Sequence, residues 1–234
     1  MNTQVFRFPS VEQALTLVAR SPEPIAILGA GRTDAGVHAR GMVAHVDLPM
    51  SPGEARQLIY RTDRYLPHDI ALYDIRPVRE EAHARFSATS RTYRYYVTLR
   101  KDPFQEVRML RLYFPLDFDR MNEAAGRLKD FTDFTSFSKL HTDVKTNNCR
   151  VTEAYWQAGV EEGQWIFTIT ADRFLRNMVR AVVGTLFQVG KGRLSVEDFC
   201  AVIEAKDRGQ AGSSAPAHAL YLEQVGYPED LYLD

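Results

Sequence analysis

The chain has little cysteine, since Cys149 and Cys200 are the only two among its 234 residues. Two thiols are too few for the disulfide framework of a small secreted domain. Together with the six histidines they show no CxxC, HExxH or HxH spacing, which excludes the usual zinc motifs. We therefore expect a metal-free protein of the reducing cytoplasm.

Long apolar runs are also missing. No stretch approaches the roughly 18 consecutive apolar residues that a membrane helix needs. The first residues have neither the apolar core of a signal peptide nor the character of a transit peptide. Hydrophobic residues make up 45% of the chain and charged residues 25%, as in ordinary folded proteins. We expect a soluble chain with no membrane partner, long enough for one large domain or two small ones.

An excess of one charge sign is absent as well, because 29 basic residues face 30 acidic ones. The charges are nevertheless unevenly spread. Five basic residues and no acidic one lie between 173 and 193, and seven basic residues lie between 85 and 111. Of the 29 basic residues 23 are arginine, whose planar guanidinium suits phosphate and can stack on bases. The pattern is compatible with RNA binding, and equally with clusters of solvated surface charge.

Periodicity and capping motifs predict the order α-β-β-α-β for the first part of the chain. A capping box at Ser10 predicts a helix that ends near Arg20, and a second box at Ser51 opens another helix. Short strands are predicted over 25–28, 42–46 and 69–76. This is the order of a β-α-β-β-α-β unit without its first strand. We expect that the start codon is misassigned, that the strand is supplied in another way, or that it is lost together with catalysis.

The second part of the chain shows the full pattern. Strands are predicted over 92–99, 151–156, 165–170 and 218–225, and helices over 117–128, 173–189 and 195–205. On the helix over 173–189, Arg173, Arg176 and Arg180 would form one polar stripe opposite an apolar stripe. We predict an α/β (α+β) fold with a mixed, mostly antiparallel sheet. Its N-terminal half would span 1–84 and its C-terminal half 85–234.

The glycine-rich octet at 29–36 follows a predicted strand, as a dinucleotide-binding turn does. Its third glycine stands five positions after the second instead of three, and no helix opens there to attract a phosphate. This spacing disfavours a nucleotide-dependent enzyme. The octet also contains Arg32 and Asp34. A carboxylate close to a guanidinium stays ionised and can act as a nucleophile or base. The alternative is an aspartate that only hydrogen-bonds its own turn.

Five blocks follow one another along most of the chain: GRTDAGVHA at 31–39, RFSA at 85–88, RTYRY at 91–95, DFTSF at 133–137 and FLRNMVRAVVGTL at 174–186. In this order they resemble the tRNA pseudouridine synthase A family. The resemblance implies a pseudouridine synthase fold of two ferredoxin-like halves with a central RNA-binding cleft. It also implies a homodimer that isomerises uridines in the tRNA anticodon stem-loop without a metal, redox or nucleotide cofactor.

Carried onto this chain, the resemblance makes Asp34 the nucleophile and Arg180 its partner. Tyr93 would receive the flipped uracil. Arg32 would help to displace it, because a uridine inside a stem is unreachable until it leaves the stack. Arg94 would contact a phosphate. The aspartate would either add to the base or attack the sugar. The alternative function, motivated by the missing strand, is a non-catalytic tRNA-binding or chaperone protein on the same scaffold.

Overall fold

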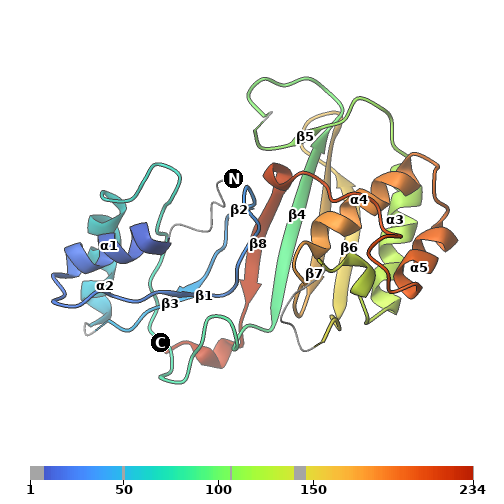
Figure 1. Cartoon of the computed structure of the whole chain (residues 1–234). Helices are drawn as coiled ribbons and strands as arrows, with labels where there is room; N and C mark the ends of the chain where they lie inside the picture. The colour runs from blue at the N-terminus through green and yellow to red at the C-terminus, as the bar shows by residue number, and fades with distance from the viewer. Residues whose placement is uncertain (1–7, 49–50, 106, 140–145, 234) are drawn as a thin grey trace. The chain divides into compact units, whose positions relative to one another are not determined.

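The protein has a mixed α/β fold with a mixed sheet, as the sequence predicts (Figure 1). The computed structural model describes residues 8–48, 51–105, 107–139 and 146–233. The helices are α1 (Phe8–Ala19), α2 (Pro52–Asp63), α3 (Phe118–Arg127), α4 (Met178–Gly190) and α5 (Val196–Glu204). The strands are β1 (Leu28–Gly29), β2 (His38–Ala39), β3 (Ala44–His45), β4 (Ser90–Thr98), β5 (Leu110–Arg111), β6 (Val151–Ala158), β7 (Gln164–Ala171) and β8 (Leu220–Gly226).

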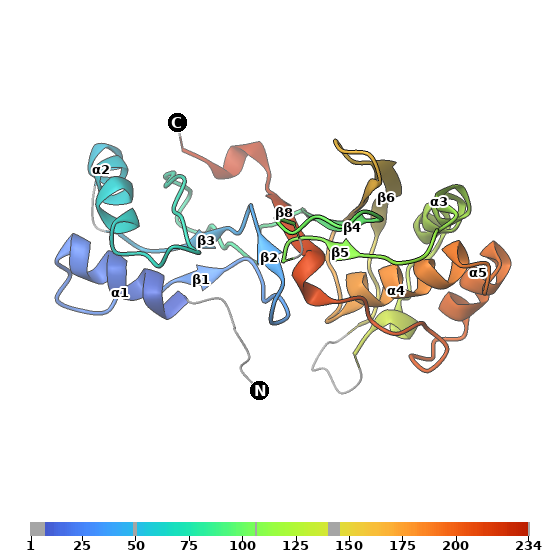
Figure 2. The same cartoon turned by 90° about the horizontal axis from the view of Figure 1, so that it is seen from above.

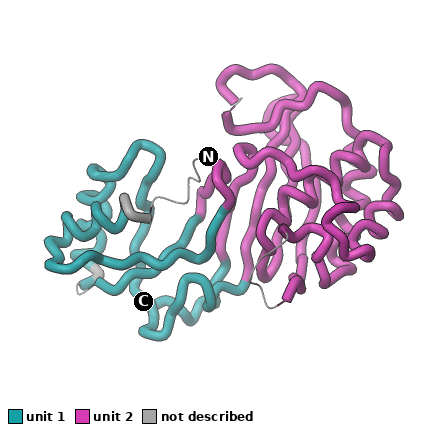
Figure 3. The backbone as a smooth tube through the Cα atoms, in the orientation of Figure 1, with its two compact units in different colours: residues 1–33, 42–89, 226–234 teal, residues 34–41, 90–225 magenta. Residues whose placement is uncertain are grey.

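Two compact units make up the chain, and the division does not follow a single cut (Figure 3). Unit 1 consists of residues 1–33, 42–89 and 226–234, and unit 2 consists of residues 34–41 and 90–225. The short segment 34–41 therefore belongs to the unit that is otherwise built from the C-terminal part of the chain. The assignment of two halves over 1–84 and 85–234 stays a prediction.

Unit 2 is organised around one sheet with the strand order β2-β8-β4-β7-β6, and β5 pairs with β4 beside this path. Strands β4, β7 and β6 are antiparallel neighbours, whereas β2 runs parallel to β8. In this register Tyr93 lies opposite Ile169 and Tyr95 opposite Phe167. Successive side chains of a strand point to opposite faces. Tyr93 and Tyr95 therefore share one face of β4, and Arg94 lies on the other.

Helices α3, α4 and α5 cover one face of this sheet (Figure 2). Helix α4 is apolar on nearly all sides and is almost completely buried, as expected for a helix in the middle of a core. The core between helices and sheet contains Tyr95, Phe167 and Ile169 from the strands and Met178 and Leu186 from α4. Helices α3 and α5 begin where the sequence predicts them, directly after Asp117 and Ser195, whose side chains cap them.

Unit 1 contains helices α1 and α2 and a short antiparallel pair in which Leu28 of β1 lies opposite His45 of β3. The α2 helix starts at the predicted capping box, where the Ser51 hydroxyl accepts a hydrogen bond from the Glu54 backbone and the Glu54 carboxylate accepts one from the Ser51 backbone. Helix α1 begins at Phe8, so Ser10 lies inside the helix and the predicted cap at Ser10 is wrong.

Two further predictions from periodicity are wrong. Residues 69–76 form no strand within this described stretch. The Leu72 backbone amide donates instead to the carboxylate of Asp63, so this extended segment does not enter a ladder. The helix predicted from residue 173 starts only at Met178, because Asn177 adopts a left-handed conformation with φ of 67°. Arg173 and Arg176 therefore lie before the helix, and the predicted arginine stripe does not form.

Candidate active site

The centre of the candidate site is an ion pair between Asp34 and Arg180, both in unit 2. Asp34 Oδ2 lies 3.0 Å from Arg180 Nη1, and both side chains are about 22% exposed. Arg180 lies in the first turn of α4, and its Nε donates a second hydrogen bond to the Ala215 carbonyl at 2.7 Å. The guanidinium is therefore held from two sides. It presents one edge to the carboxylate in a partly desolvated place, where charge interactions are stronger than in water.

Backbone contacts hold the segment that carries Asp34. The Val37 amide donates to the Asp34 carbonyl at 3.1 Å, which closes a turn. Within the turn, Gly36 has a φ of +81°, a conformation that side-chain-bearing residues rarely adopt. After the turn β2 pairs with β8, and the amides of Arg40 and Gly41 both donate to the carbonyl of Leu222. Gly36 of the octet thus serves the turn, and the close approach of backbone occurs at Gly41, beyond the octet, where an added Cβ would lie 2.3 Å from the Glu223 carbonyl oxygen.

Tyr93 belongs to the same neighbourhood. Its ring packs edge-to-face against Phe174, with ring centroids 5.2 Å apart. Burial raises the pKa of the Tyr93 hydroxyl to about 12, Arg91 opposes this increase, and the Asp34 carboxylate adds to it. The hydroxyl is therefore protonated at neutral pH and is available as a hydrogen-bond donor. Tyr93 therefore presents a flat ring and a protonated hydroxyl beside a carboxylate and a guanidinium.

The structure does not bring Arg94 to this group. Arg94 follows Tyr93 on β4 and so points to the opposite face of the sheet. There its Nε is buried without a hydrogen-bond partner among the described residues, and the same holds for the hydroxyl of its cross-strand neighbour Thr168. Arg32 lies in unit 1, two residues before Asp34 along the chain. The geometry of unit 2 thus joins Asp34, Arg180 and Tyr93, and separates Arg94 from them.

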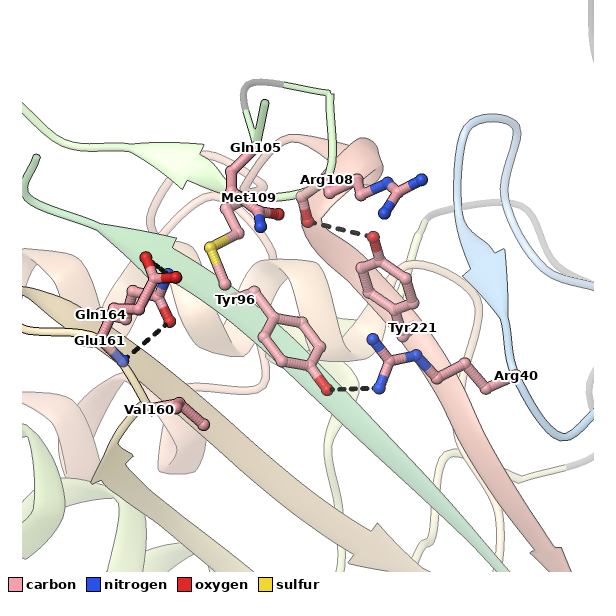
Figure 4. Close-up of a pocket in the computed structure, with 9 residues that line it drawn as sticks. All are labelled: Arg40, Tyr96, Gln105, Arg108, Met109, Val160, Glu161, Gln164 and Tyr221. Carbon is pink, nitrogen blue, oxygen red and sulfur yellow. Dashed lines mark hydrogen bonds between the residues drawn. The ribbon is translucent and has the colours of Figure 1, made fainter. Parts of the chain in front are cut away.

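A cluster that sequence reasoning missed lies at the other end of the Asp34 segment (Figure 4). The Arg40 guanidinium lies over the rings of both Tyr96 and Tyr221, at 5.5 and 5.2 Å. The Tyr96 hydroxyl donates to the Glu223 carboxylate at 2.7 Å, and Arg40 lies 3.7 Å from the same carboxylate. These contacts anchor the segment after Asp34. The alternation of β4, which places Tyr96 on the face opposite Tyr93, was the only signal for it.

This cluster opens into a polar pocket of about 280 Å³ (Figure 4). The pocket is lined by Arg40, Tyr96, Gln105, Arg108, Met109, Val160, Glu161, Gln164 and Tyr221. The Tyr221 hydroxyl donates to the Arg108 carbonyl at 3.1 Å. Burial raises the pKa of Tyr96, and its hydrogen bond to Glu223 adds to this increase. Both rings are thus fixed by their hydroxyls, so the pocket wall that supports Arg40 is rigid.

The Asp172 carboxylate has a structural role. In the structure one carboxylate oxygen of Asp172 accepts hydrogen bonds from the amides of Arg150 at 2.8 Å and Arg173 at 2.7 Å. Asp172 therefore ties the connection before α4 to the start of β6.

Metal-ligand clusters and membrane-spanning helices are both absent from the described part of the chain. No three side chains of His, Cys, Asp or Glu gather there in a way that could hold a metal ion. Likewise, none of the described helices has the length and apolar character needed to cross a membrane.

Comparisons with known proteins agree on one family. A family model described as tRNA pseudouridine synthase matches residues 128–228. A protein of Porphyromonas gingivalis named tRNA pseudouridine synthase A is 62% identical over 96% of this chain and 88% of its own length. Proteins with the same name from Parabacteroides distasonis and Bacillus subtilis are 58% and 38% identical. These matches cover 95% and 93% of this chain, and 87% of each relative.

Proposed function

Since the chain belongs to the tRNA pseudouridine synthase A family, we propose that it is an isomerase that converts uridine to pseudouridine in tRNA. The observation that carries this proposal is the 3.0 Å ion pair between Asp34 and Arg180, formed on one unit beside Tyr93. The two charged side chains come from positions 146 residues apart. The pair orients a carboxylate, which a nucleophile requires.

The reaction exchanges one bond for another on the same nucleotide. The bond between N1 of uracil and C1′ of the ribose breaks, the base rotates, and a bond from C5 to C1′ forms. The hydrogen on C5 then leaves as a proton, and N1 ends with a proton, so no electrons are gained or lost. In our proposal the Asp34 carboxylate is the nucleophile, which either adds to the base or attacks C1′. Arg180 holds the carboxylate in place throughout.

Tyr93, Arg32 and Arg94 bind and position the RNA. In our proposal Tyr93 stacks against the flipped uracil, and its protonated hydroxyl donates a hydrogen bond, because its pKa of about 12 keeps the proton at neutral pH. Arg32 helps to displace the uridine from its stack, which costs a few kcal/mol. Arg94, on the other face of β4, contacts an RNA phosphate outside this group.

Three finer points belong to the same proposal. The uridines lie in the anticodon stem-loop, the enzyme acts as a homodimer, and it works in the cytoplasm, where unmodified tRNA is available. The resemblance of the five sequence blocks to the family supports these points, and light scattering of the purified chain tests the homodimer. The alternative of a non-catalytic tRNA-binding protein is not favoured, because Asp34, Arg180 and Tyr93 are all present and two of them are paired.

The decisive experiment is tritium release from unmodified tRNA labelled at C5 of uridine. The chain is expected to release tritium, and Asp34→Asn is expected to release none while it binds tRNA as before. Arg180→Lys should lower kcat by about 100-fold, because lysine cannot contact Ala215 and Asp34 at once with the geometry of a guanidinium. The matched control is Arg127→Lys, whose partner Asp130 forms an exposed ion pair on α3. Equal release by the chain and by Asp34→Asn would contradict the proposal.

A further inference from the structure

One face of helix α2, in unit 1, is basic and exposed. Its buried side consists of Ala55, Leu58 and Thr62. On the opposite side Arg56, Tyr60 and Arg64 follow one another at intervals of four residues, and Gln57 and Arg61 form a second row beside them. All five of these side chains are exposed. We call these five residues the α2 basic face. Arg56, Gln57, Tyr60 and Arg61 line an open surface pocket of about 460 Å³.

The arginines of this face lack carboxylate partners. No ion pair joins Arg56, Arg61 or Arg64 to any acidic side chain in the described part of the chain. The two acidic residues of the helix are engaged elsewhere, since Glu54 bonds to Ser51 at the cap and Asp63 accepts the Leu72 amide. None of the three guanidinium groups is therefore held in an ion pair in the described part of the chain.

Helix α3 offers a contrast. Its two exposed arginines, Arg120 and Arg127, are each paired with a carboxylate three residues away, Asp117 and Asp130. This is the usual arrangement of a solvated helix surface. The arginines of the α2 basic face are not paired in this way, although both helices are exposed and carry a similar proportion of arginine.

The stability of helix α2 does not explain why its arginines lack carboxylate partners. Cations near the C-terminal end of a helix are favourable, which covers Arg61 and Arg64. Arg56 lies two turns before Arg64, about 12 Å away along the axis, where this effect has decayed. Neighbouring charges in this row lie within about 8 Å of one another along the axis, which is one Debye length at physiological ionic strength, and so they repel one another. A polyanion bound along the helix would relieve that repulsion.

Tyr60 adds a second feature. The Arg64 guanidinium lies 4.5 Å from the centroid of the Tyr60 ring, and Arg64 also donates a hydrogen bond to the Tyr60 hydroxyl. The ring is 64% exposed and holds the guanidinium against the helix. A pre-oriented guanidinium loses less side-chain entropy when it forks around a phosphate.

We propose that the α2 basic face binds the phosphate backbone of the tRNA substrate, as a contact surface separate from the Asp34 and Arg180 pair. The proposal rests on the proposed function for its choice of polyanion. Guanidinium groups recognise phosphate oxygens without reading the base sequence, and the face presents three of them along one helix. Binding there positions the RNA and contributes affinity without taking part in the chemical step.

The test is equilibrium binding of unmodified tRNA at several salt concentrations. The triple variant Arg56→Gln, Arg61→Gln, Arg64→Gln should weaken binding roughly tenfold at low salt. The slope of log affinity against log salt should become shallower by about two to three, because counterions are no longer released by those contacts. The triple Lys variant should keep most of the affinity. The control is Arg120→Gln, Arg127→Gln on α3, for which no change is expected. Melting temperatures verify that all variants fold.

Two outcomes overturn the inference. One is an affinity and salt slope of the Gln variant equal to those of the wild-type chain, which would leave an acidic protein as the partner of this face. The other is an equal loss in the Gln and Lys variants, which would indicate a structural role. Since binding is measured without turnover, the result is separable from the proposed function. A wild-type chain that binds tRNA by this face but releases no tritium would refute only the enzymatic proposal.

Discussion

At the residue scale, one arginine links the helix core to the Asp34 carboxylate. Arg180 bonds to the Ala215 carbonyl through Nε and to Asp34 through Nη1. Its own carbonyl accepts the Ala215 amide at 2.9 Å. The side chain is therefore held between the Ala215 carbonyl and the Asp34 carboxylate, and the Ala215 amide ties the same segment to the backbone of Arg180. In the proposed reaction, a carboxylate that is held this way needs no reorganisation before the chemical step.

A second residue, His45 in unit 1, makes stability depend on pH. Its Nδ1 accepts a hydrogen bond from the Ala84 amide at 3.1 Å, which requires a neutral ring nitrogen. Burial lowers the pKa of His45 below its ordinary value of 6.5, the nearby His83 lowers it further, and Asp47 opposes this. Above pH 6.5 the ring is neutral in both the folded and unfolded states.

We therefore expect the unfolding free energy to fall as the pH drops below about 6.5, because the unfolded chain then binds a proton that the folded chain resists. Urea unfolding at pH 7.5 and 5.5 measures this loss. In His45→Asn the part of the loss that belongs to this residue should disappear. His218→Asn, which changes a histidine of unit 2, is the control. An identical pH dependence in His45→Asn and the wild-type chain would contradict the expectation.

At the element scale, the close contact between α4 and the chain before β8 determines where Arg180 lies. A side chain at Gly184 would place its Cβ 1.8 Å from the Ser213 carbonyl oxygen, and one at Gly212 would meet the Gly184 carbonyl at 2.9 Å. Glycine at both positions lets the segment run directly along the helix. The segment then reaches Ala215, the residue that Arg180 contacts.

Gly184→Ala should accordingly force the segment away from α4. We expect a loss of about 1–3 kcal/mol in unfolding free energy, as for an overpacked core, together with a fall in kcat as the Ala215 contact loosens. Gly126→Ala in α3 is the matched control, since no atom lies within 4 Å of its added Cβ. It should raise stability by up to about 1 kcal/mol. Equal effects of the two substitutions, measured by urea unfolding and tritium release, would refute this account of α4.

At the scale of the whole molecule, the two units differ in how much apolar surface they bury. Among the described residues, the core cluster of unit 2 contains 32 buried side chains and that of unit 1 contains five. Hydrophobic burial is the main favourable contribution to folding. Local opening costs least where few apolar contacts are broken.

The rates of amide hydrogen exchange should therefore differ between the two units. We expect the amides of α4 to exchange only through global unfolding, and those of α1 and α2 to exchange at least about 100-fold faster through local opening of unit 1. Mass spectrometry of peptic fragments measures both helices in one experiment. The amides of α3 serve as the internal reference for an exposed helix on the larger core. Equal protection of α2 and α3 would contradict the expected difference.

The sequence by itself determined the elements whose signals are local. The capping box at Ser51 placed α2, sequence periodicity placed α3 and α5, and the alternation of β4 placed Tyr93 and Arg94 on opposite faces. These signals act within a few residues, so a single sequence contains them. The order of five sequence blocks also identified the family, which the comparisons confirm.

Tertiary structure decided the rest. The extended segment 69–76 did not become a strand because a strand needs a partner, and the Asp63 carboxylate took one of its amides. The helix over 173–189 was shortened by the left-handed Asn177. The ion pair of Asp34 and Arg180 joins groups 146 residues apart, and only packing of α4 against the sheet brings them together. Contacts of that separation depend on the whole core, which no local pattern encodes.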